Sequence, residues 1–267
     1  MKLGFIGLGN MAKAMIGGIL AKGAATPDEI MGSAKSSASR EYAKEKWGIL
    51  LAEDNKQVAA YADVLILAVK PQILPEVVAE IKDAVKEHTV IVSIAAGVSI
   101  EKLEKLFGGK KKIVRCMPNT PALVGMGCTG VCCNEAVTKT EMEQCLTLLG
   151  SFGLAEEVPE KLMDAVVGVS GSSPAYVFLF LEALADGAVK AGMPRAQAYR
   201  FAAQSVMGSA ALALETGKHP GELKDMVCSP GGTTIDAVQV LEDMGFRSSV
   251  MNAVEACVEK SRKLDKN

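Results

Sequence analysis

GFIGLGNMAKAMIGG, residues 4–18, joins an apolar run to a helical pattern through Gly7, Gly9 and the small residue Ala12. Gly7 permits a tight turn, Gly9 lets the backbone approach a pyrophosphate, and Ala12 allows the helix to pack closely on the strand. The helix start offers unpaired amides to an anion. Because a strand precedes the pattern and a second strand follows within about 30 residues, a dinucleotide site is favoured over an ordinary glycine-rich turn.

Short apolar runs alternate with helical patterns from the start of the chain to about residue 160. This alternation predicts a parallel sheet that is covered by helices on both faces. Runs such as VLILAV are apolar at every position, as expected of strands that are buried on both sides. The expected strands are KLGFIGL, EIMGS, ILLA, DVLILAV, TVIVSIA, KIVRCM and, as the last, CTGVCC.

Long helical patterns replace the strands after about Glu160. They cover residues 173–192, 194–217 and 246–264. These helices are apolar nearly all round, more than about 100 residues could bury within themselves, which favours a subunit interface. A tight bundle packed on the first domain is the alternative. We therefore predict an α/β protein with an N-terminal Rossmann-type parallel-sheet domain (residues 1–160) and an all-α C-terminal dimerisation domain (residues 161–267).

Composition narrows the class of partner. Lys and Arg number 29 against 31 Asp and Glu, so the formal net charge of −2 gives no long-range attraction for nucleic acid or an anionic membrane. The seven cysteines form no Cys-x-x-Cys pair, which argues against a disulfide framework or zinc site and fits a reduced, cytoplasmic compartment. The glycine-rich opening does not resemble a signal peptide, and the most apolar segment, residues 175–181, is well short of the about 20 residues that cross a bilayer. We expect a small-molecule ligand, no nucleic acid and no membrane span.

The residues after the second expected strand bear on the choice of cofactor. An NAD site places an acidic residue there for the ribose hydroxyls, whereas this chain has Ser33, Lys35 and Arg40 in MGSAKSSASR. Hydroxyls and cations suit a 2′-phosphate, so NADPH is favoured, with NADH as the alternative. Lys35 and Arg40 can also be explained as solvated charges on a helix face.

Further loops follow the next expected strands, and the carboxyl ends of parallel strands form the ligand crevice in such sheets. Asn55 follows the third strand, AVKP (residues 68–71) ends the fourth, and IAAGVS ends the fifth. Lys70 is a candidate catalytic acid, phosphate contact or structural partner, and we favour a role in cofactor positioning. The loop RCMPNTP, residues 115–121, either walls the crevice or is a structural turn.

Few residues suit acid–base catalysis. The chain has two histidines, His88 and His219, and no spacing of His, Cys and carboxylates suggests a metal. Hydride transfer to a ketone normally needs a strong acid–base group. A protonated imine is already electrophilic, so its reduction mainly requires placement beside a nicotinamide.

SPGGTTID, residues 229–236, offers a place for a small anion. A helix that begins near Thr233 or Thr234 presents unpaired amides, the glycines permit a close-fitting nest, and Ser229 and Thr234 add hydroxyl groups. Such a loop could hold a carboxylate. An ordinary Ser/Thr-capped helix start explains the same residues equally well.

Six segments, taken in order, resemble the pyrroline-5-carboxylate reductase family along almost the whole chain: FIGLGNMA, ILAVKP, SIAAGVS, RCMPNTP, SGSSPAY and SPGGTTIDAVQVLE. The resemblance implies NAD(P)H-dependent reduction of (S)-1-pyrroline-5-carboxylate to L-proline, the last step of proline biosynthesis. It also implies a helical domain that interlocks with its copy in a homodimer, and in many members a decamer of five dimers. Two residues depart from the pattern: Ser173 stands where the family usually has Gly, and Met226 where a relative has Asn.

The resemblance also assigns residues to the site. Thr234 would orient the ring nitrogen through its hydroxyl, as the catalytic residue. The substrate carboxylate would be held by Ser229 and the backbone of Gly232, Thr233 and Thr234. Together with Lys35, the residues that would bind the nucleotide are Ile6, Gly7, Leu8, Gly9, Asn10, Met11, Ser33, Asn55, Ala68, Val69, Lys70, Pro71, Ala95, Ala96 and Gly97.

Two other functions compete with this one. An NADP-dependent β-hydroxyacid dehydrogenase also joins a Rossmann domain to helices, but it needs a catalytic Lys on the first long helix, and Lys190 falls too near the C-terminal end of that helix. A non-catalytic NADP(H)-binding module would keep Gly7 and Gly9 but would have no use for SPGGTT.

Overall fold

The computed structural model describes residues 1–265, which divide into two compact units. Unit 1 comprises Met1–Ser172 and the chain end from Ala256, and unit 2 comprises Ser173–Glu255. The expected domain limits, 1–160 and 161–267, stay a prediction. Residues 266 and 267, at the end of the second expected domain, lie outside the described residues.

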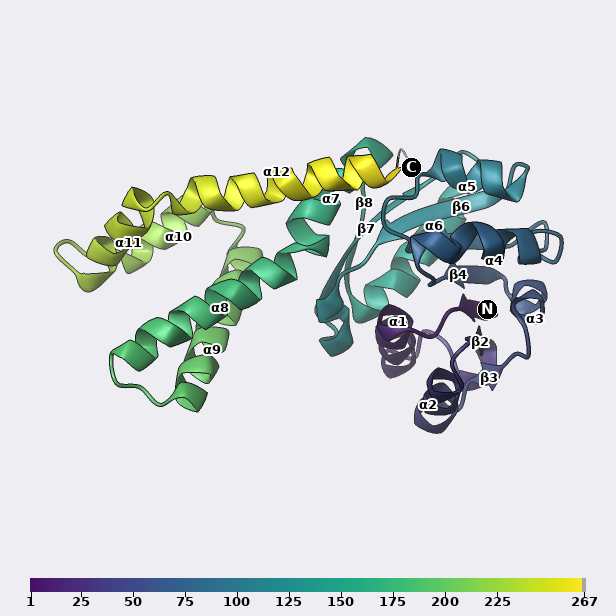
Figure 1. Ribbon diagram of the computed structural model, residues 1–267, viewed down its shortest axis with the longest axis horizontal. Coiled ribbons are helices and arrows are strands. Elements are labelled where there is room, and N and C mark those ends of the chain that lie inside the picture. Colours follow the sequence, from purple (N-terminus) through teal and green to yellow (C-terminus); the bar gives the residue numbers. More distant parts are fainter. Residues whose placement is uncertain (266–267) are drawn as a thin grey trace. The chain divides into compact units, whose positions relative to one another are not determined.

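Unit 1 is built on an eight-stranded sheet in the order β3-β2-β1-β4-β5-β6-β7-β8 (Figure 1). Neighbouring strands are parallel except β6 and β7, which are antiparallel. The order reverses between β1 and β4, where ligands bind in open parallel sheets. The strands are β1 (Leu3–Ile6), β2 (Ile30–Ser33), β3 (Leu50–Leu51), β4 (Val64–Leu67), β5 (Val90–Ser93), β6 (Lys112–Met117), β7 (Gly127–Cys133) and β8 (Gly153–Glu157).

Alternate residues of the strands face opposite sides of the sheet, so unit 1 has two cores. Phe5 and Ile66 belong to the core beneath α1, α2 and α6, whereas Leu65 and Leu67 belong to the core beneath α3, α4 and α5. The helices are α1 (Asn10–Ala21), α2 (Ser37–Trp47), α3 (Asn55–Tyr61), α4 (Leu74–Ile81), α5 (Ile100–Phe107), α6 (Lys139–Leu149) and α7 (Met163–Val166). This doubly covered, mostly parallel sheet confirms the predicted Rossmann-type fold.

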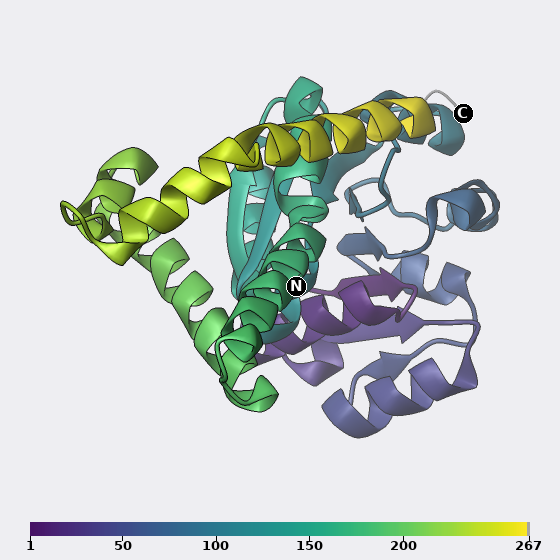
Figure 2. The same cartoon turned by 60° about the vertical axis from the view of Figure 1, so that its left-hand side comes forward.

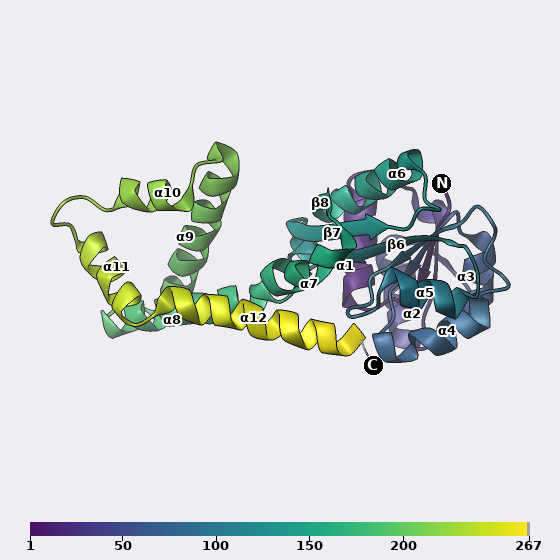
Figure 3. The same cartoon turned by 90° about the horizontal axis from the view of Figure 1, so that it is seen from above.

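Unit 2 is helical, and no strand occurs within residues 173–255. Figure 2 shows α8 beside α9, where Arg195 forms an ion pair with Asp186, and Figure 3 shows α10 and α11 following α9. The ring centroids of Phe180 and Phe246 lie 6.1 Å apart, which joins α8 to the start of α12. The helices are α8 (Ser173–Lys190), α9 (Arg195–Thr216), α10 (Pro220–Val227), α11 (Thr233–Asp243) and α12 (Phe246–Asp265), whose last part belongs to unit 1.

Two expectations need correction. CTGVCC is not the last strand, because β8 follows it and pairs in parallel with β7. The argument that the apolar segment is too short to cross a membrane is also wrong, because that segment belongs to a continuous helical run, Glu160–Lys190, of sufficient length and apolarity. Only 11% of the most apolar stretch of this run is buried. We therefore expect a surface outside this single chain to bury its exposed apolar face.

Candidate functional site

The carboxyl ends of four parallel strands lie level in the sheet. Ile6 is paired with Ser33 on one side and Leu67 on the other, and Leu67 is paired with Ser93. Backbone hydrogen bonds continue past this row, from Gly7 N–H to Ser33 O (2.9 Å) and from Ala68 N–H to Ile6 O (2.9 Å). The loops therefore leave the sheet side by side. This arrangement brings together the predicted nucleotide residues 6–11, 33, 68–71 and 95–97.

Gly7 and Gly9 differ in what surrounds them. Gly7 has φ +96°, and a Cβ there would lie 2.4 Å from the carbonyl oxygen of Ala68, so only glycine fits the turn. At Gly9 the backbone is extended, and a Cβ would meet nothing within 4 Å. Gly9 is the N-cap of α1, whose first turn receives no side-chain cap. Open space next to these helix amides fits a pyrophosphate.

Ser33 and Asn55 form one hydrogen-bonded chain with a residue that sequence reasoning missed. The Ser33 hydroxyl donates to Asn55 Oδ1 at 2.7 Å, and Asn55 Nδ2 donates to Glu80 Oε2 at 2.7 Å. Ser33 ends β2 and is 4% exposed, Asn55 begins α3, and Glu80 lies on α4. Glu80 resembles any exposed helix charge in the sequence, so only the three-dimensional contact identifies it.

The two lysines among the predicted nucleotide residues are exposed. Lys35 Nζ lies 3.7 Å from Glu76 Oε1, and the Lys35 side chain is 82% exposed. Lys70 is the N-cap of the short 3₁₀ helix η2 (Pro71–Ile73), and its carbonyl oxygen accepts from Ile73 N–H at 3.1 Å. Both side chains are therefore available to a ligand's phosphate at this edge of the sheet.

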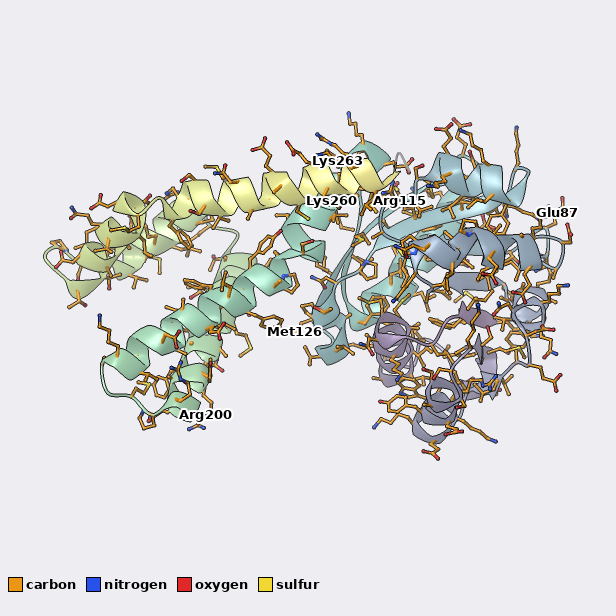
Figure 4. All side chains as sticks on the ribbon, in the orientation of Figure 1. Glu87, Arg115, Met126, Arg200, Lys260 and Lys263 are labelled. Atoms are coloured by element: carbon orange, nitrogen blue, oxygen red, sulfur yellow. The ribbon has the colours of Figure 1, made fainter. Side chains whose placement is uncertain are left out.

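The polar side chains of Arg115 and Asn119 in the loop RCMPNTP form hydrogen bonds to other residues of unit 1. Arg115, labelled in Figure 4, is buried, and its Nη1 lies 2.9 Å from Glu160 Oε1, which also accepts the Ile100 N–H at 2.8 Å. Asn119 donates to Ser170 O at 3.0 Å and accepts the Cys128 N–H at 2.8 Å. These bonds favour the interpretation as a structural turn over that as a ligand-binding wall.

Thiol chemistry is disfavoured at the buried cysteines of unit 1, which lie on β6, β7 and α6. Burial raises the pKa of the Cys132 and Cys145 thiols to about 12, and it raises the pKa of Cys116 further. These thiols stay protonated near neutral pH and are poor nucleophiles. Within residues 1–265, no group of three or more His, Cys, Asp or Glu side chains is arranged to hold a metal ion.

The segment SPGG forms a turn in unit 2. Gly232 N–H donates to Ser229 O at 3.0 Å, Pro230 occupies the second position, and Gly231 has φ +66°, as a type II turn requires. Gly232 is the N-cap of α11 and supplies no side-chain cap, so α11 does not have the Ser/Thr-capped start that we considered. A Cβ at Gly232 would lie 2.5 Å from Ser229 Oγ, which places that hydroxyl close to the helix start.

Two helices begin at a glycine N-cap and have no side-chain cap; α4, α7 and α9 also lack a side-chain cap, but their N-cap residues are not glycine. Side chains cap α2, α3, α5, α6 and α10, through Ser36, Asp54, Ser99, Thr138 and His219 respectively. The helices α1 and α11 begin instead at Gly9 and Gly232, with no side chain on their first amides. Both starts can therefore accept an external anion.

Comparisons with known proteins cover the whole chain. A family model described as "Pyrroline-5-carboxylate reductase dimerisation" matches residues 160–264, and one described as "NADP oxidoreductase coenzyme F420-dependent" matches residues 2–97. The chain is 52% identical over 266 residues to the pyrroline-5-carboxylate reductase of Escherichia coli (strain K12), covering 100% of this chain and 99% of that protein.

Two solved structures share both fold and sequence with the chain. A pyrroline-5-carboxylate reductase from Coxiella burnetii has a TM-score of 0.93 and 38% identity, covering 100% of this chain and 99% of that one. The Plasmodium falciparum pyrroline carboxylate reductase, solved with NADP bound, has a TM-score of 0.90 and 35% identity, covering 99% of this chain and 98% of that one.

Proposed function

The chain belongs to the pyrroline-5-carboxylate reductase family, and from this premise we propose that it reduces (S)-1-pyrroline-5-carboxylate to L-proline, using NADPH in preference to NADH. The observation that carries the proposal is the start of α11, where SPGG presents amides that no side chain caps. A carboxylate is the anion that this substrate offers. The level row of strand ends, with the open space at Gly9, supports the nucleotide site.

The nucleotide is held by unit 1 in this proposal. The first amides of α1 face its pyrophosphate, Gly7 keeps the turn tight, and Ser33 with Asn55 lies toward the ribose end. Lys35 supplies positive charge for a 2′-phosphate. When bound, the cofactor supplies the hydride, and residues 68–71 and 95–97 limit where the nicotinamide end of the nucleotide can lie.

The substrate is held by the start of α11. The amides of Gly232, Thr233 and Thr234, with the Ser229 hydroxyl, receive the carboxylate. The Thr234 hydroxyl oxygen accepts the N–H of the protonated imine and so fixes the ring plane. Because that imine is already electrophilic at C5, the side chains orient the ring and need not transfer a proton before hydride arrives.

The working form is a homodimer that assembles further into a decamer in the cytoplasm. The apolar faces of unit 2 and the matched dimerisation family support the dimer. A second copy is a better cover for the run Glu160–Lys190 than a membrane, because exposed apolar side chains extend over α8, α9, α11 and α12, well beyond that run. Light scattering across protein concentrations distinguishes the monomer, dimer and decamer.

The direct test follows NADPH absorbance with pyrroline-5-carboxylate and, in parallel, with β-hydroxyacids and NADP⁺. We expect oxidation of NADPH that depends on the imine and produces proline. Reaction with hydroxyacids alone would replace the proposal by a hydroxyacid dehydrogenase, which the position of Lys190 as the last residue of α8 disfavours. Binding of NADPH without turnover of either substrate would indicate a non-catalytic module.

A further inference from the structure

Glu80 lies outside every nucleotide-binding motif of the chain, yet it ends the hydrogen-bonded chain that begins at Ser33. Asn55 Nδ2 lies 2.7 Å from Glu80 Oε2, and Asn55 Oδ1 lies 2.7 Å from Ser33 Oγ. The three residues come from α4, α3 and β2 of the same compact unit. They link an exposed carboxylate to the hydroxyl of buried Ser33, the last residue of β2.

The Glu80 carboxylate decides which way the Asn55 amide points. An ionised carboxylate only accepts hydrogen bonds, so the amide nitrogen must face it and the amide oxygen must face Ser33. A reversed amide would place two oxygens against each other at this distance. The Ser33 hydroxyl therefore has to donate its single hydrogen to Asn55.

This orientation leaves Ser33 with lone pairs but no hydrogen for a ligand. A ribose hydroxyl can donate to such an oxygen, whereas the oxygens of a phosphate dianion cannot. The negative charge of Glu80 acts in the same direction, against a phosphate. The cation that would favour the phosphate, Lys35, has Glu76 as a neighbour at 3.7 Å and is largely solvated.

We propose that Glu80 is a positioning residue that, by fixing the Asn55 amide, turns Ser33 into a hydrogen-bond acceptor and so restrains the preference for NADPH over NADH. This inference rests on the proposed function for the presence of a dinucleotide at this edge. It goes beyond that function by assigning cofactor selectivity to a residue that does not itself touch the nucleotide.

The test compares Glu80→Ala with Glu53→Ala. Glu53 is an exposed carboxylate two residues before Asn55, and its loss removes the same charge without freeing the amide. We expect Glu80→Ala to raise the ratio of NADPH to NADH affinity roughly 2- to 10-fold, the size of one net hydrogen bond, with Glu53→Ala unchanged. Calorimetric binding of each nucleotide to the full chain measures this ratio. An unchanged ratio in Glu80→Ala, or an equal rise in both variants, would overturn the inference.

Ser33→Ala provides a second, opposite readout. If Ser33 accepts from the ribose, its loss weakens NADH binding more than NADPH binding. A larger loss for NADPH would show that Ser33 donates to the phosphate, and the inference would be wrong. A general loss of structure would weaken both nucleotides together and lower Tm, so it would not change the ratio.

Nucleotide binding separates this inference from the proposed reaction. If the ratio shifts as expected but pyrroline-5-carboxylate is not reduced, the reaction is wrong and the role of Glu80 stands. If the imine is reduced but the ratio does not move, only the role of Glu80 fails. Absence of binding by both nucleotides would overturn the two together.

Discussion

The two units of the chain differ in whether their large apolar side chains are buried. Unit 1 buries large side chains in two clusters, one on each face of its sheet. The buried hydrophobic residues recorded within unit 2 are alanines: Ala185, Ala198 and Ala202. Its large side chains face outward, with Phe178 64%, Leu179 70% and Leu214 82% exposed. Burial of apolar surface stabilises a fold by about 25 cal/mol for each Å². Unit 2 on its own therefore lacks most of the stabilisation that a core of large side chains provides.

This difference separates the two halves of the proposed reaction. The predicted nucleotide residues 6–11, 33 and 55 belong to unit 1, which has cores of its own within one chain. The SPGG turn belongs to a unit whose apolar faces are exposed and which we propose a second copy covers. Nucleotide binding should therefore survive in a monomer. Reduction of the imine should not, because a second copy that binds the folded form of unit 2 also stabilises the substrate site on that unit.

A charge in the exposed apolar face of unit 2 should have the largest effect. Leu179→Asp would place an unpaired carboxylate in the proposed dimer interface, where such charges cost about 3–5 kcal/mol. We expect the dimer dissociation constant to rise more than about 100-fold and turnover to disappear at assay concentrations, while NADPH still binds. Light scattering, calorimetry and the absorbance assay measure the three outcomes.

Leu50→Asp is the matched control for Leu179→Asp. Leu50 lies on the edge strand β3 of unit 1 and is also exposed. Its replacement should leave the dimer intact. A Leu179→Asp variant that remains a fully active dimer would show that the exposed face of unit 2 is not the interface.

The next largest effect concerns the hydroxyl at the start of α11. Thr234→Val keeps the shape of the side chain and removes the hydrogen bond that we propose it forms with the substrate, so we expect kcat/KM to fall by the equivalent of about 1–3 kcal/mol. The affinity for NADPH should be nearly unchanged, since the proposed nucleotide site lies in unit 1 and Thr234 lies in unit 2. Thr216→Val makes the same chemical change at the end of α9 and should keep full activity. Equal kcat/KM in the two variants would remove Thr234 from the mechanism.

The sequence predicted unit 1 well where a local pattern carries the structure. Apolar runs located β1, β2, β4, β5 and β6, and Gly7 with Gly9 located the turn before α1. The strand β8, GLAEE, was missed because its polar residues give no apolar run, and its strand form comes from pairing with β7. The seven-residue helix α3 is too short to show a clear helical period of its own.

The candidate site was predictable to a different extent in each unit. Motif residues such as Ser33 and Asn55 could be named from their place after strands. Glu80 could not, because its role depends on a contact between α3 and α4 that no spacing encodes. In unit 2 the sequence predicted a helix start near Thr233 or Thr234. A Ser or Thr cap and a glycine cap were indistinguishable until the backbone placed Gly232 at the N-cap position.

The two glycines of the nucleotide loop test whether unit 1 keeps open space for a ligand. Gly9→Ala adds a methyl group that meets no protein atom within 4 Å, so the unfolding temperature should not fall. The methyl group would meet the pyrophosphate instead, and we expect the Kd for NADPH to rise about 10-fold, or about 1.4 kcal/mol. Gly7→Ala, which clashes with the Ala68 carbonyl, should lower stability as well as binding. Normal NADPH affinity in Gly9→Ala would place the pyrophosphate elsewhere.

The smallest expected effect concerns the stability of unit 1 at acidic pH and the contribution that Asp63 makes to it. Partial burial of Asp63 acts to raise its pKa, but hydrogen bonds from the Lys2 backbone N–H and from Lys86, together with the Lys86 charge, lower it to about 2. A carboxyl group whose pKa is lowered by folding stabilises the folded state above its ordinary pKa, near 4, and that contribution is lost as the pH falls toward 2.

Asp63→Asn should therefore reduce the loss of stability between pH 4 and pH 2. The side chain is 38% exposed, so the difference should be below about 1 kcal/mol. Urea unfolding followed by the fluorescence of Trp47, the single tryptophan of the chain and a residue of unit 1, reports this unit directly.

The exposed Asp83 provides the control as Asp83→Asn, which should lose stability with pH as the parent does. If Asp63→Asn and the parent lose stability equally, Asp63 does not account for the acid sensitivity of unit 1. If the Leu179→Asp monomer shows the same acid profile as the dimer, unit 1 is stable without the partner that unit 2 requires.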